Sequence, residues 1–539
     1  MSGELATDIN APSSAEKDTF GYKNEMHKGF SMLSLLGLTF AILNSWVAMA
    51  TSLTIALPSG GPSAILWGDI VAGVGTLALA ASLAEICAVY PTAAGQYYWT
   101  AVLASPRYSK VLSWICGWFN VAGWVFLVAA GGSLGGTLIT SIIALLHDGY
   151  VVERWHIFLL YVAYTLGALF LNVFAVRLLP KIDQAALIWS LGGLIVISIT
   201  LLATASPTFQ SGSFVFRGFI NTTGWPDGVA WILGLLQPAF GLTAFDACAH
   251  IVEEIPDPGL HAPRAMVLAV LIGIGTSFVF LVILLFCMNN LDSVLTSTAG
   301  PLLEIFYQAT GNKAGAVCLL IIPVVCWAFT TQAILTTASR MVYAFARDGG
   351  LPFSRQLAVV NKKYKVPIAA LLFCTVWVII FGCIFLGSPS ALNAIISSSV
   401  VSLNLSYAMP IVILLLRGRN RLPIGSFALG NVLGYTTNIV GLIYVIGTTI
   451  FFLFPPAFPT NATTMNYTVV VFGVIAIISG LTWIIQGRKH YEGPLKGHAS
   501  SAVESTPVRG DLFPVDKGEE KVKKDDCSSR ITVTEHYAA

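Results

Sequence analysis

Four ionisable residues follow an interruption in a strongly apolar stretch between Leu236 and Met266. Small and polar residues at 240–244 interrupt the run, and after them stand Asp246, His250, Glu253 and Glu254. A charged group in the hydrocarbon layer of a membrane costs about 2.5–3.5 kcal/mol on insertion scales and persists mainly where it faces a cavity or a partner. A helix that loosens in mid-membrane also exposes backbone N–H and C=O groups that protein, water or a ligand must satisfy. The two features together predict the binding helix of a secondary transporter.

Three roles fit Asp246 from its position. Its carboxylate pairs with a substrate ammonium, carries a proton, or caps the broken helix. Desolvation favours the protonated form of a carboxyl group, which is what a proton carrier needs. We expect His250 to be an interior histidine with satisfied hydrogen bonds rather than a proton relay.

Glu85 is a second candidate for proton coupling, because it lies deep in another apolar segment. The alternative is an ion pair at the end of that segment with a basic residue such as Arg177 or Arg264.

Glu253 and Glu254 are predicted to form an inner gate with Arg340 or Arg347. Ion pairs that break and re-form are a natural two-state element in a transporter.

The composition requires a membrane to surround the elements that position these residues. The 539 residues are 55% hydrophobic and only 10% charged, with a mean hydropathy of +0.77. Soluble domains are about 25% charged, whereas roughly 20 apolar residues suffice to span a bilayer. We therefore predict an all-α integral membrane protein with about twelve transmembrane helices, near 32–57, 63–89, 112–146, 156–175, 184–206, 228–250, 264–288, 315–346, 367–386, 391–416, 427–452 and 465–487.

The positive charges predict the orientation of these helices. With twelve spans both termini lie on one side, and 26 of the 29 Lys and Arg residues fall there, leaving Arg154, Arg217 and Lys313 on the other. The positive-inside bias then makes both termini cytosolic. The first apolar segment follows a polar tail of about 30 residues and is too long for a signal-peptide core.

The polar ends of the chain are predicted to be disordered cytosolic tails, 1–28 and 488–539, flanking one transporter domain at 29–487. The plasma membrane is the expected location, with a vacuolar or other endomembrane as the alternative. Three glycosylation acceptor patterns fall outside under this orientation, at Asn221, Asn461 and Asn466.

Cofactor and nucleotide chemistry find no support in the sequence. The nine Cys lack metal-type spacing, and no nucleotide fingerprint is present, so we expect no metal, cofactor, ATP-driven step or enzymatic activity. We expect a small-molecule substrate, a proton and the lipid bilayer as partners, and no nucleic acid.

The first apolar segment carries its own polar interruption at 44–50. Five spans separate it from the interruption at 240–244, so two five-span units would insert with opposite orientation. Inverted repeats with interrupted first helices indicate a substrate site near the membrane midplane.

These residues resemble the amino acid–polyamine–organocation (APC) superfamily, and within it the fungal amino acid/choline group that includes GABA and choline permeases. The resemblance covers roughly residues 30–490 in the family's order. The matching patterns are Asn44-Ser45-Trp46 with Ser59-Gly60-Gly61-Pro62, Ser82 to Glu85 with Tyr90 to Trp99, Phe245-Asp246 with Glu253-Glu254-Ile255-Pro256 and Pro263-Arg264-Ala265, and Ser339-Arg340-Met341 with 346–352.

The resemblance implies a LeuT-like core of two inverted five-helix repeats plus two C-terminal helices, with proton-coupled import by alternating access. It places the substrate between interrupted helices one and six, with walls from helices three and eight. The residues implied to contact it are Asn44, Ser45, Trp46, Val47, Ala48, Asn120, Trp124, Thr243, Ala244, Phe245, Asp246, Thr330 and Ile334.

Each of these residues has a plainer alternative, which is packing between helices. Trp46 would matter most for choline, because an indole can hold a cationic head by a cation–π contact worth about 0.5–2 kcal/mol. Some bacterial relatives carry a Lys in helix five in place of a coupling sodium ion, and the corresponding segment here has none.

Two other classes of protein have many membrane helices, namely channels and receptors. Channels favour rings of carbonyls or charges in symmetric pores, and no short repeated filter sequence occurs here. A nutrient-sensing receptor with the same fold and little transport is the remaining alternative to a transporter.

Overall fold

The computed structural model describes residues 31–147, 149–387, 391–461 and 464–494. Within these ranges the chain is helical, and the β-structure is a single bridge between Ser59 and Asn221. In the part of the chain that the structure describes, ten helices are long and apolar enough to cross a membrane. The apolar helix Ile368–Cys383 and the interrupted segment 227–250 complete the twelve predicted crossings.

The crossing segments follow one another in chain order. They are α1 (Met32–Leu43) with α2 (Ser45–Thr51) and α3 (Leu53–Ala56), α4 (Gly61–Val89), α6 (Ser109–Leu146), α7 (Arg154–Phe174), α8 (Leu179–Ala205), α10 (Asp227–Gly234) with α11 (Leu236–Gly241) and α12 (Ala247–His250), α13 (Pro258–Phe286), α16 (Lys313–Arg347), α18 (Ile368–Gly387), α19 (Ala391–Arg417), α20 (Gly430–Phe451) and α21 (Thr468–Thr482).

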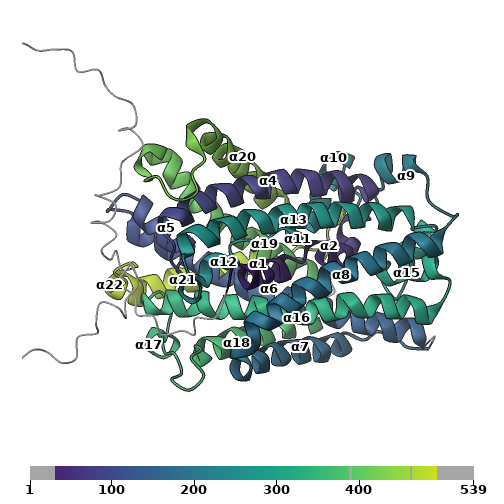
Figure 1. The fold of residues 1–539 in the computed structure, drawn as a ribbon, viewed down its shortest axis with the longest axis horizontal. Coiled ribbons are helices and arrows are strands. Elements are labelled where there is room, and N and C mark those ends of the chain that lie inside the picture. Colours follow the sequence, from purple (N-terminus) through teal and green to yellow (C-terminus); the bar gives the residue numbers. More distant parts are fainter. Residues whose placement is uncertain (1–30, 148, 388–390, 462–463, 495–539) are drawn as a thin grey trace, which may run out of the picture.

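Shorter helices cap the two ends of the bundle. They are α5 (Gln96–Leu103), α9 (Gly212–Arg217), α14 (Leu291–Thr296), α15 (Pro301–Thr310), α17 (Ser354–Leu357), α22 (Arg488–His490), the 3₁₀ turns η2 (Val176–Leu178), η3 (Val252–Glu254) and η4 (Arg419–Arg421), and the π-helical turn η5 (Trp483–Gly487). Figure 1 shows α5, α17 and α22 at the left end, which we name the terminal end, and α9, α10 and α15 at the opposite, far end.

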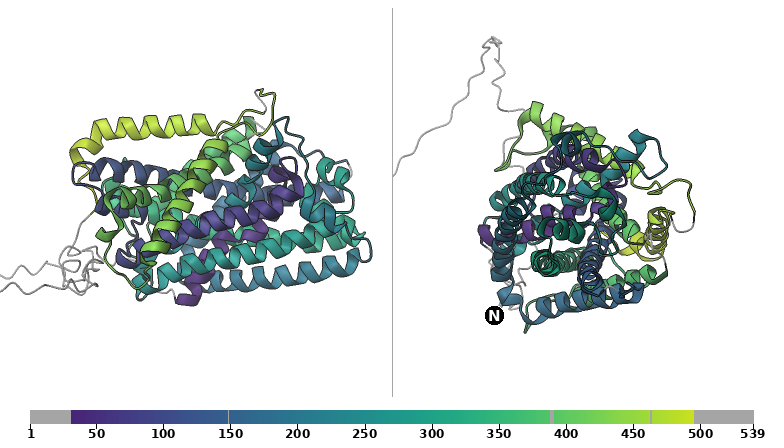
Figure 2. Two further views of the ribbon diagram at one scale, coloured as in Figure 1. Left: turned by 90° about the horizontal axis from the view of Figure 1, so that it is seen from above. Right: turned by 90° about the vertical axis from the view of Figure 1, so that its right-hand side faces the viewer.

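Burial separates an inner group of helices from an outer one. Most of the apolar window is buried in α1–α2 (83%), α4 (72%), α6 (67%) and α19 (72%), but only 6% in the last crossing segment. Figure 2 shows α21 on the outer surface of the bundle. Large apolar side chains such as Ile188 on α8 and Val432 on α20 are 73% and 84% exposed. A surface of this kind is stable against lipid tails and unfavourable in water, so it belongs in a bilayer.

Both predicted interruptions are real breaks in helices. Asn44 adopts a left-handed conformation (φ 35°, ψ 48°) between α1 and α2. In the sixth crossing segment, residues 242–246 separate α11 from α12, and Ala244 has φ 74°. Asn tolerates this region because its short polar side chain bonds locally, whereas an Ala there is strained.

The structure describes the first residues of the predicted C-terminal tail, 488–494. Residues 488–494 are ordered, and the Tyr491 ring is 2% exposed against Trp114 and Phe345. Its hydroxyl lies 2.8 Å from that of Ser113, and burial raises the pKa of Tyr491 well above its usual value, so the phenol stays neutral. The predicted N-terminal tail, 1–28, and the rest of the C-terminal one, 495–539, lie outside the described residues.

Candidate functional site

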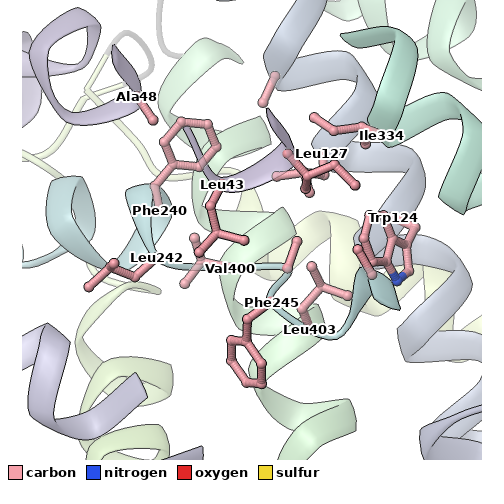
Figure 3. Close-up of a cluster of buried hydrophobic side chains, with 14 of the residues drawn as sticks. Leu43, Ala48, Trp124, Leu127, Phe240, Leu242, Phe245, Ile334, Val400 and Leu403 are labelled. Carbon is pink, nitrogen blue, oxygen red and sulfur yellow. The ribbon is translucent and has the colours of Figure 1, made fainter. Parts of the chain in front are cut away.

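The two helix breaks face an apolar centre built from five segments. Figure 3 shows its labelled side chains, which come from the first and sixth crossing segments and from α6, α16 and α19: Leu43, Ala48, Trp124, Leu127, Phe240, Leu242, Phe245, Ile334, Val400 and Leu403. All ten are at most 5% exposed. An apolar site with a few placed polar groups is typical for binding a small organic molecule.

Asn44 holds the first break to two neighbouring helices. Its side-chain Oδ1 accepts from the hydroxyl of Ser190 at 2.8 Å, and its Nδ2 donates to Oγ1 of Thr330 at 3.4 Å. Thr330 in turn donates to the carbonyl of Ala41 at 2.7 Å. The backbone carbonyl of Asn44 accepts from the N–H groups of Val47 and Ala48 at 2.9 Å, which starts α2.

Trp46 faces outward from the break in this conformation. Its Nε1 donates to Ser190 at 2.8 Å, and its indole meets the ring of Phe280 edge-on at 4.8 Å. Ser45 points toward α13, where a Cβ at Gly273 would lie 2.5 Å from its hydroxyl oxygen. Both side chains therefore anchor α2 against α8 and α13.

The second break combines a strained backbone with an aromatic contact. The hydroxyl of Thr243 donates to the carbonyl of Ala239 at 2.6 Å and closes the last turn of α11. Phe245 packs on the ring of Tyr407 in α19, with the centroids 4.8 Å apart. Ala244, which lies between Thr243 and Phe245, has a left-handed backbone conformation and turns the chain toward α12.

Asp246 is completely buried and has three hydrogen-bond partners. Oδ1 accepts from the hydroxyl of Tyr407 at 2.5 Å, and Oδ2 accepts from Nε2 of Gln96 at 2.7 Å. Nε2 of His250 lies 3.1 Å from the same Oδ2. Asn120 on α6 extends the network by donating to Oε1 of Gln96 at 2.5 Å. Asp246 is therefore engaged by protein groups from α5, α12 and α19.

Of the other sequence-predicted residues, Trp124 meets the ring of His250 edge-on at 5.7 Å. Ile334 on α16 belongs to the apolar centre. The predicted substrate residues thus do not form one cluster: some lie around the apolar centre, Asn120 and Asp246 lie in the polar network beside it, and Ser45 and Trp46 pack against α8 and α13.

A cavity of about 380 Å³ lies at the far end of the bundle, between the first and sixth crossing segments and α19. Its lining includes Ser52, Thr54, Leu236, Asn393 and Ser397. We name this cavity the vestibule. Its volume lies within the range of about 300–1,000 Å³ that is usual for small-molecule sites.

Two ion pairs join η3 to α16 near the terminal end. Arg340 donates to Glu254 at 2.9 Å with side chains 1% and 3% exposed, and Arg347 donates to Glu253 at 2.8 Å with side chains 15% and 5% exposed. Each of these two glutamates therefore contacts one of the two arginines named in the sequence analysis. Tyr97 adds a hydrogen bond to Asp348 at 2.7 Å.

Glu85 pairs with Arg419 rather than with the predicted Arg177 or Arg264. Its other oxygen accepts from the backbone N–H of Leu429 at 3.0 Å. Both charged side chains are at most 3% exposed. The contact ties α4 to the turn between α19 and α20.

The three glycosylation candidates differ in accessibility. The amide of Asn466 is 2% exposed and donates to the carbonyls of Phe452 and Phe454 at 2.7 and 3.1 Å, so it is a poor acceptor. Asn221 is half-buried and donates to Asp227 at 2.8 Å. Asn461 is exposed. Among the described residues no group of three His, Cys, Asp or Glu side chains could hold a metal ion.

Paired helix breaks in a bundle of twelve apolar crossing segments define a multi-pass membrane permease. The chain belongs to the amino acid permease family, whose model matches residues 30–475. It is a transporter and not an enzyme.

Several relatives match over nearly the whole domain. The choline transporter of Saccharomyces cerevisiae is 36% identical over 475 residues, covering 86% of this chain and 83% of its own length. A putative amino acid/polyamine transporter of Macrophomina phaseolina is 37% identical, covering 80% and 96%. The amino-acid permease BAT1 of Arabidopsis thaliana is 32% identical, covering 88% and 95%.

Proposed function

We propose that this chain is a proton-coupled secondary transporter that imports an amino acid, GABA or a choline-like amine by alternating access. In this proposal it lies in the plasma membrane with both termini in the cytosol. The far end and its vestibule then face the outside.

The main support for this proposal is the difference between the two ends of the bundle. The vestibule approaches the two helix breaks from the far end, whereas buried ion pairs and the Tyr97–Asp348 hydrogen bond close the terminal end. A site that is approached from one side while the other is closed is one half of an alternating-access cycle. The conformation is then the outward-facing one.

The chemistry between the breaks suits a small amphipathic amine. Asp246 already has three partners, so a substrate ammonium would depend on aromatic faces and backbone carbonyls instead. Phe240 lies in the apolar centre and stacks with Trp327 at 6.4 Å. A cation over such faces gains about 0.5–2 kcal/mol. Trp46 would act by positioning the first break rather than by covering the substrate.

The relatives support both substrate classes, because one is named for choline and others for amino acids. The first test is uptake of labelled choline, GABA and a panel of amino acids in cells that lack their own permeases for them. We expect accumulation that rises as the outside is acidified and that a protonophore abolishes. Uptake that ignores the protonophore and requires external sodium would contradict the proton coupling, and no uptake of any of these compounds would favour a sensor.

A further inference from the structure

We propose that His250 and Asp246 bind the coupling proton together, as one site that holds a single proton while the terminal end is closed. This inference rests on the proposed proton coupling and assigns the place where the proton sits.

The hydrogen-bond partners of His250 require an extra proton. Nδ1 lies 2.9 Å from the carbonyl oxygen of Ala93, which can only accept, so Nδ1 carries a hydrogen. Nε2 lies 3.1 Å from Oδ2 of Asp246. A neutral imidazole with its hydrogen on Nδ1 would present a lone pair to an ionised carboxylate, and no hydrogen bond would form. The contact therefore requires either an imidazolium facing a carboxylate or a neutral imidazole facing a carboxylic acid. Both states hold one proton more than a neutral imidazole beside an ionised carboxylate.

The pair is buried among uncharged side chains. Both side chains are completely buried. The groups that face them are Gln96 from α5, Tyr407 from α19, the indole of Trp124 from α6 and the thiol of Cys248 from α12. Among the described residues, no Lys or Arg forms an ion pair with either member. The groups named around the pair therefore carry no positive charge.

The pair is joined to the gate by the chain itself. His250 ends α12, and the next turn, η3, carries Glu253 and Glu254, which bind Arg347 and Arg340 on α16. Separation of η3 from α16 is required to open the terminal end, and it pulls on α12 directly. The same short segment therefore carries the proton site and two of the gate carboxylates.

The opposite wall of the proton site belongs to the loop before α5. Ala93 lies in this loop, Gln96 is the first residue of α5, and Gly95 between them has φ +56°. A Cβ at Gly95 would lie 2.8 Å from Cε1 of His250, so the loop packs directly on the imidazole ring. When α12 moves away from this loop, His250 loses its carbonyl partner and water reaches Nε2. The proton then leaves toward the terminal side, and the cycle is coupled to gate opening.

The test uses the full chain in proteoliposomes and compares two modes of transport. Exchange of labelled for unlabelled substrate needs no net proton movement, whereas accumulation driven by a pH gradient does. We expect His250→Gln to keep exchange within about twofold of wild type. Gradient-driven accumulation and substrate-induced proton uptake, followed with an enclosed pH dye, should fall at least tenfold. His261→Gln is the matched control, because Nδ1 of His261 also meets a carbonyl, that of Pro256, at 2.9 Å, outside this network.

The double variant separates one shared site from two independent ones. Because the pair holds one proton, His250→Gln with Asp246→Asn should be no worse than either single change, whereas independent sites would give additive losses. Tyr407→Phe provides a readout that keeps both members in place. It removes the hydrogen bond from the Tyr407 hydroxyl to Oδ1 of Asp246, so the pH profile of gradient-driven accumulation should differ from that of wild type.

The outcomes distinguish the two proposals. If wild-type uptake ignores the pH gradient, the proposed proton coupling fails. If wild-type uptake is coupled and both His250→Gln and the double variant still accumulate substrate with normal proton uptake, the assignment to this pair is wrong. An unshifted pH profile in Tyr407→Phe would count against the assignment of the proton site to His250 and Asp246, even if the variants of those two residues do not fold.

Discussion

Nε of Arg340 lies 2.9 Å from Oε1 of Glu254, in a contact where neither side chain is more than 3% exposed. The contact joins α16 to the turn that follows the break in the sixth crossing segment. Removing one partner of a buried ion pair leaves the other charge unpaired, which costs about 3–5 kcal/mol. The Arg340–Glu254 ion pair therefore strongly stabilises the closed terminal end. It separates only when both charged groups regain water together.

We predict that Glu254→Gln shifts the protein toward an open terminal end. Cys248, buried on α12, should react at least tenfold faster with a thiol reagent added from the terminal side, as measured by peptide mass mapping. Glu253→Gln is the control, because its partner Arg347 is 15% exposed and water can solvate it. The double change Glu254→Gln with Arg340→Gln should return Cys248 toward its original rate. Unchanged labelling in Glu254→Gln would show that this pair does not hold the gate.

We predict that the side chain of Asn44, and not only its backbone conformation, is needed for uptake. Asn44→Gly keeps the left-handed conformation at no steric cost but loses the contacts with Ser190 and Thr330. Asn44→Ala loses the same contacts and adds about 1–2 kcal/mol of backbone strain. Uptake should fall in both variants, whereas the melting temperature should fall further in Asn44→Ala. Normal uptake by Asn44→Gly would show that only the backbone conformation at position 44 is needed.

The sequence predicted the crossing segments because long apolar runs have few alternatives in a membrane protein. It also located both helix breaks, although the first contains neither Gly nor Pro at its centre. The physical reason is that Asn44 reaches the left-handed region while its side chain bonds to neighbouring helices. Asn in a run of apolar residues was the only local signal of this break.

The network around Asp246 was beyond sequence analysis for a different reason. Gln96 and Tyr407 lie 150 and 161 residues away along the chain, and neither has a spacing that connects it to Asp246. The interaction of Glu85 with Arg419 is likewise a product of packing across 334 residues. Sequence analysis also favoured a passive role for His250. A relay role for it becomes arguable only when both ring nitrogens are seen to face acceptors.

We predict that the vestibule is reachable from outside the cell. Ser397 and Ser398 are equally buried, but only Ser397 is among the residues that line this cavity. Ser397→Cys should therefore react with a membrane-impermeant thiol reagent on intact cells, and saturating substrate should slow that reaction. Ser398→Cys should react at least tenfold more slowly, and the parent chain supplies the background. Equal labelling of the two variants would mean that the cavity is not a pathway from the outside.

Our last prediction concerns the orientation of the chain and uses the two acceptor patterns after α20. Asn461 is exposed, whereas the Asn466 amide is buried and donates two hydrogen bonds to backbone carbonyls. If the far end is outside, Asn461→Gln should abolish a glycosidase-sensitive mobility shift, and Asn466→Gln should leave that shift intact.

The control variant should behave differently in stability. Asn466→Gln moves the amide by one methylene and weakens two hydrogen bonds worth about 0.5–1.5 kcal/mol each, so its melting temperature should fall.

If the far end is outside, an epitope at the C-terminus should be reached by antibody only after the cells are permeabilised. Labelling of that epitope on intact cells would invert the orientation, and the vestibule would then open toward the cytosol.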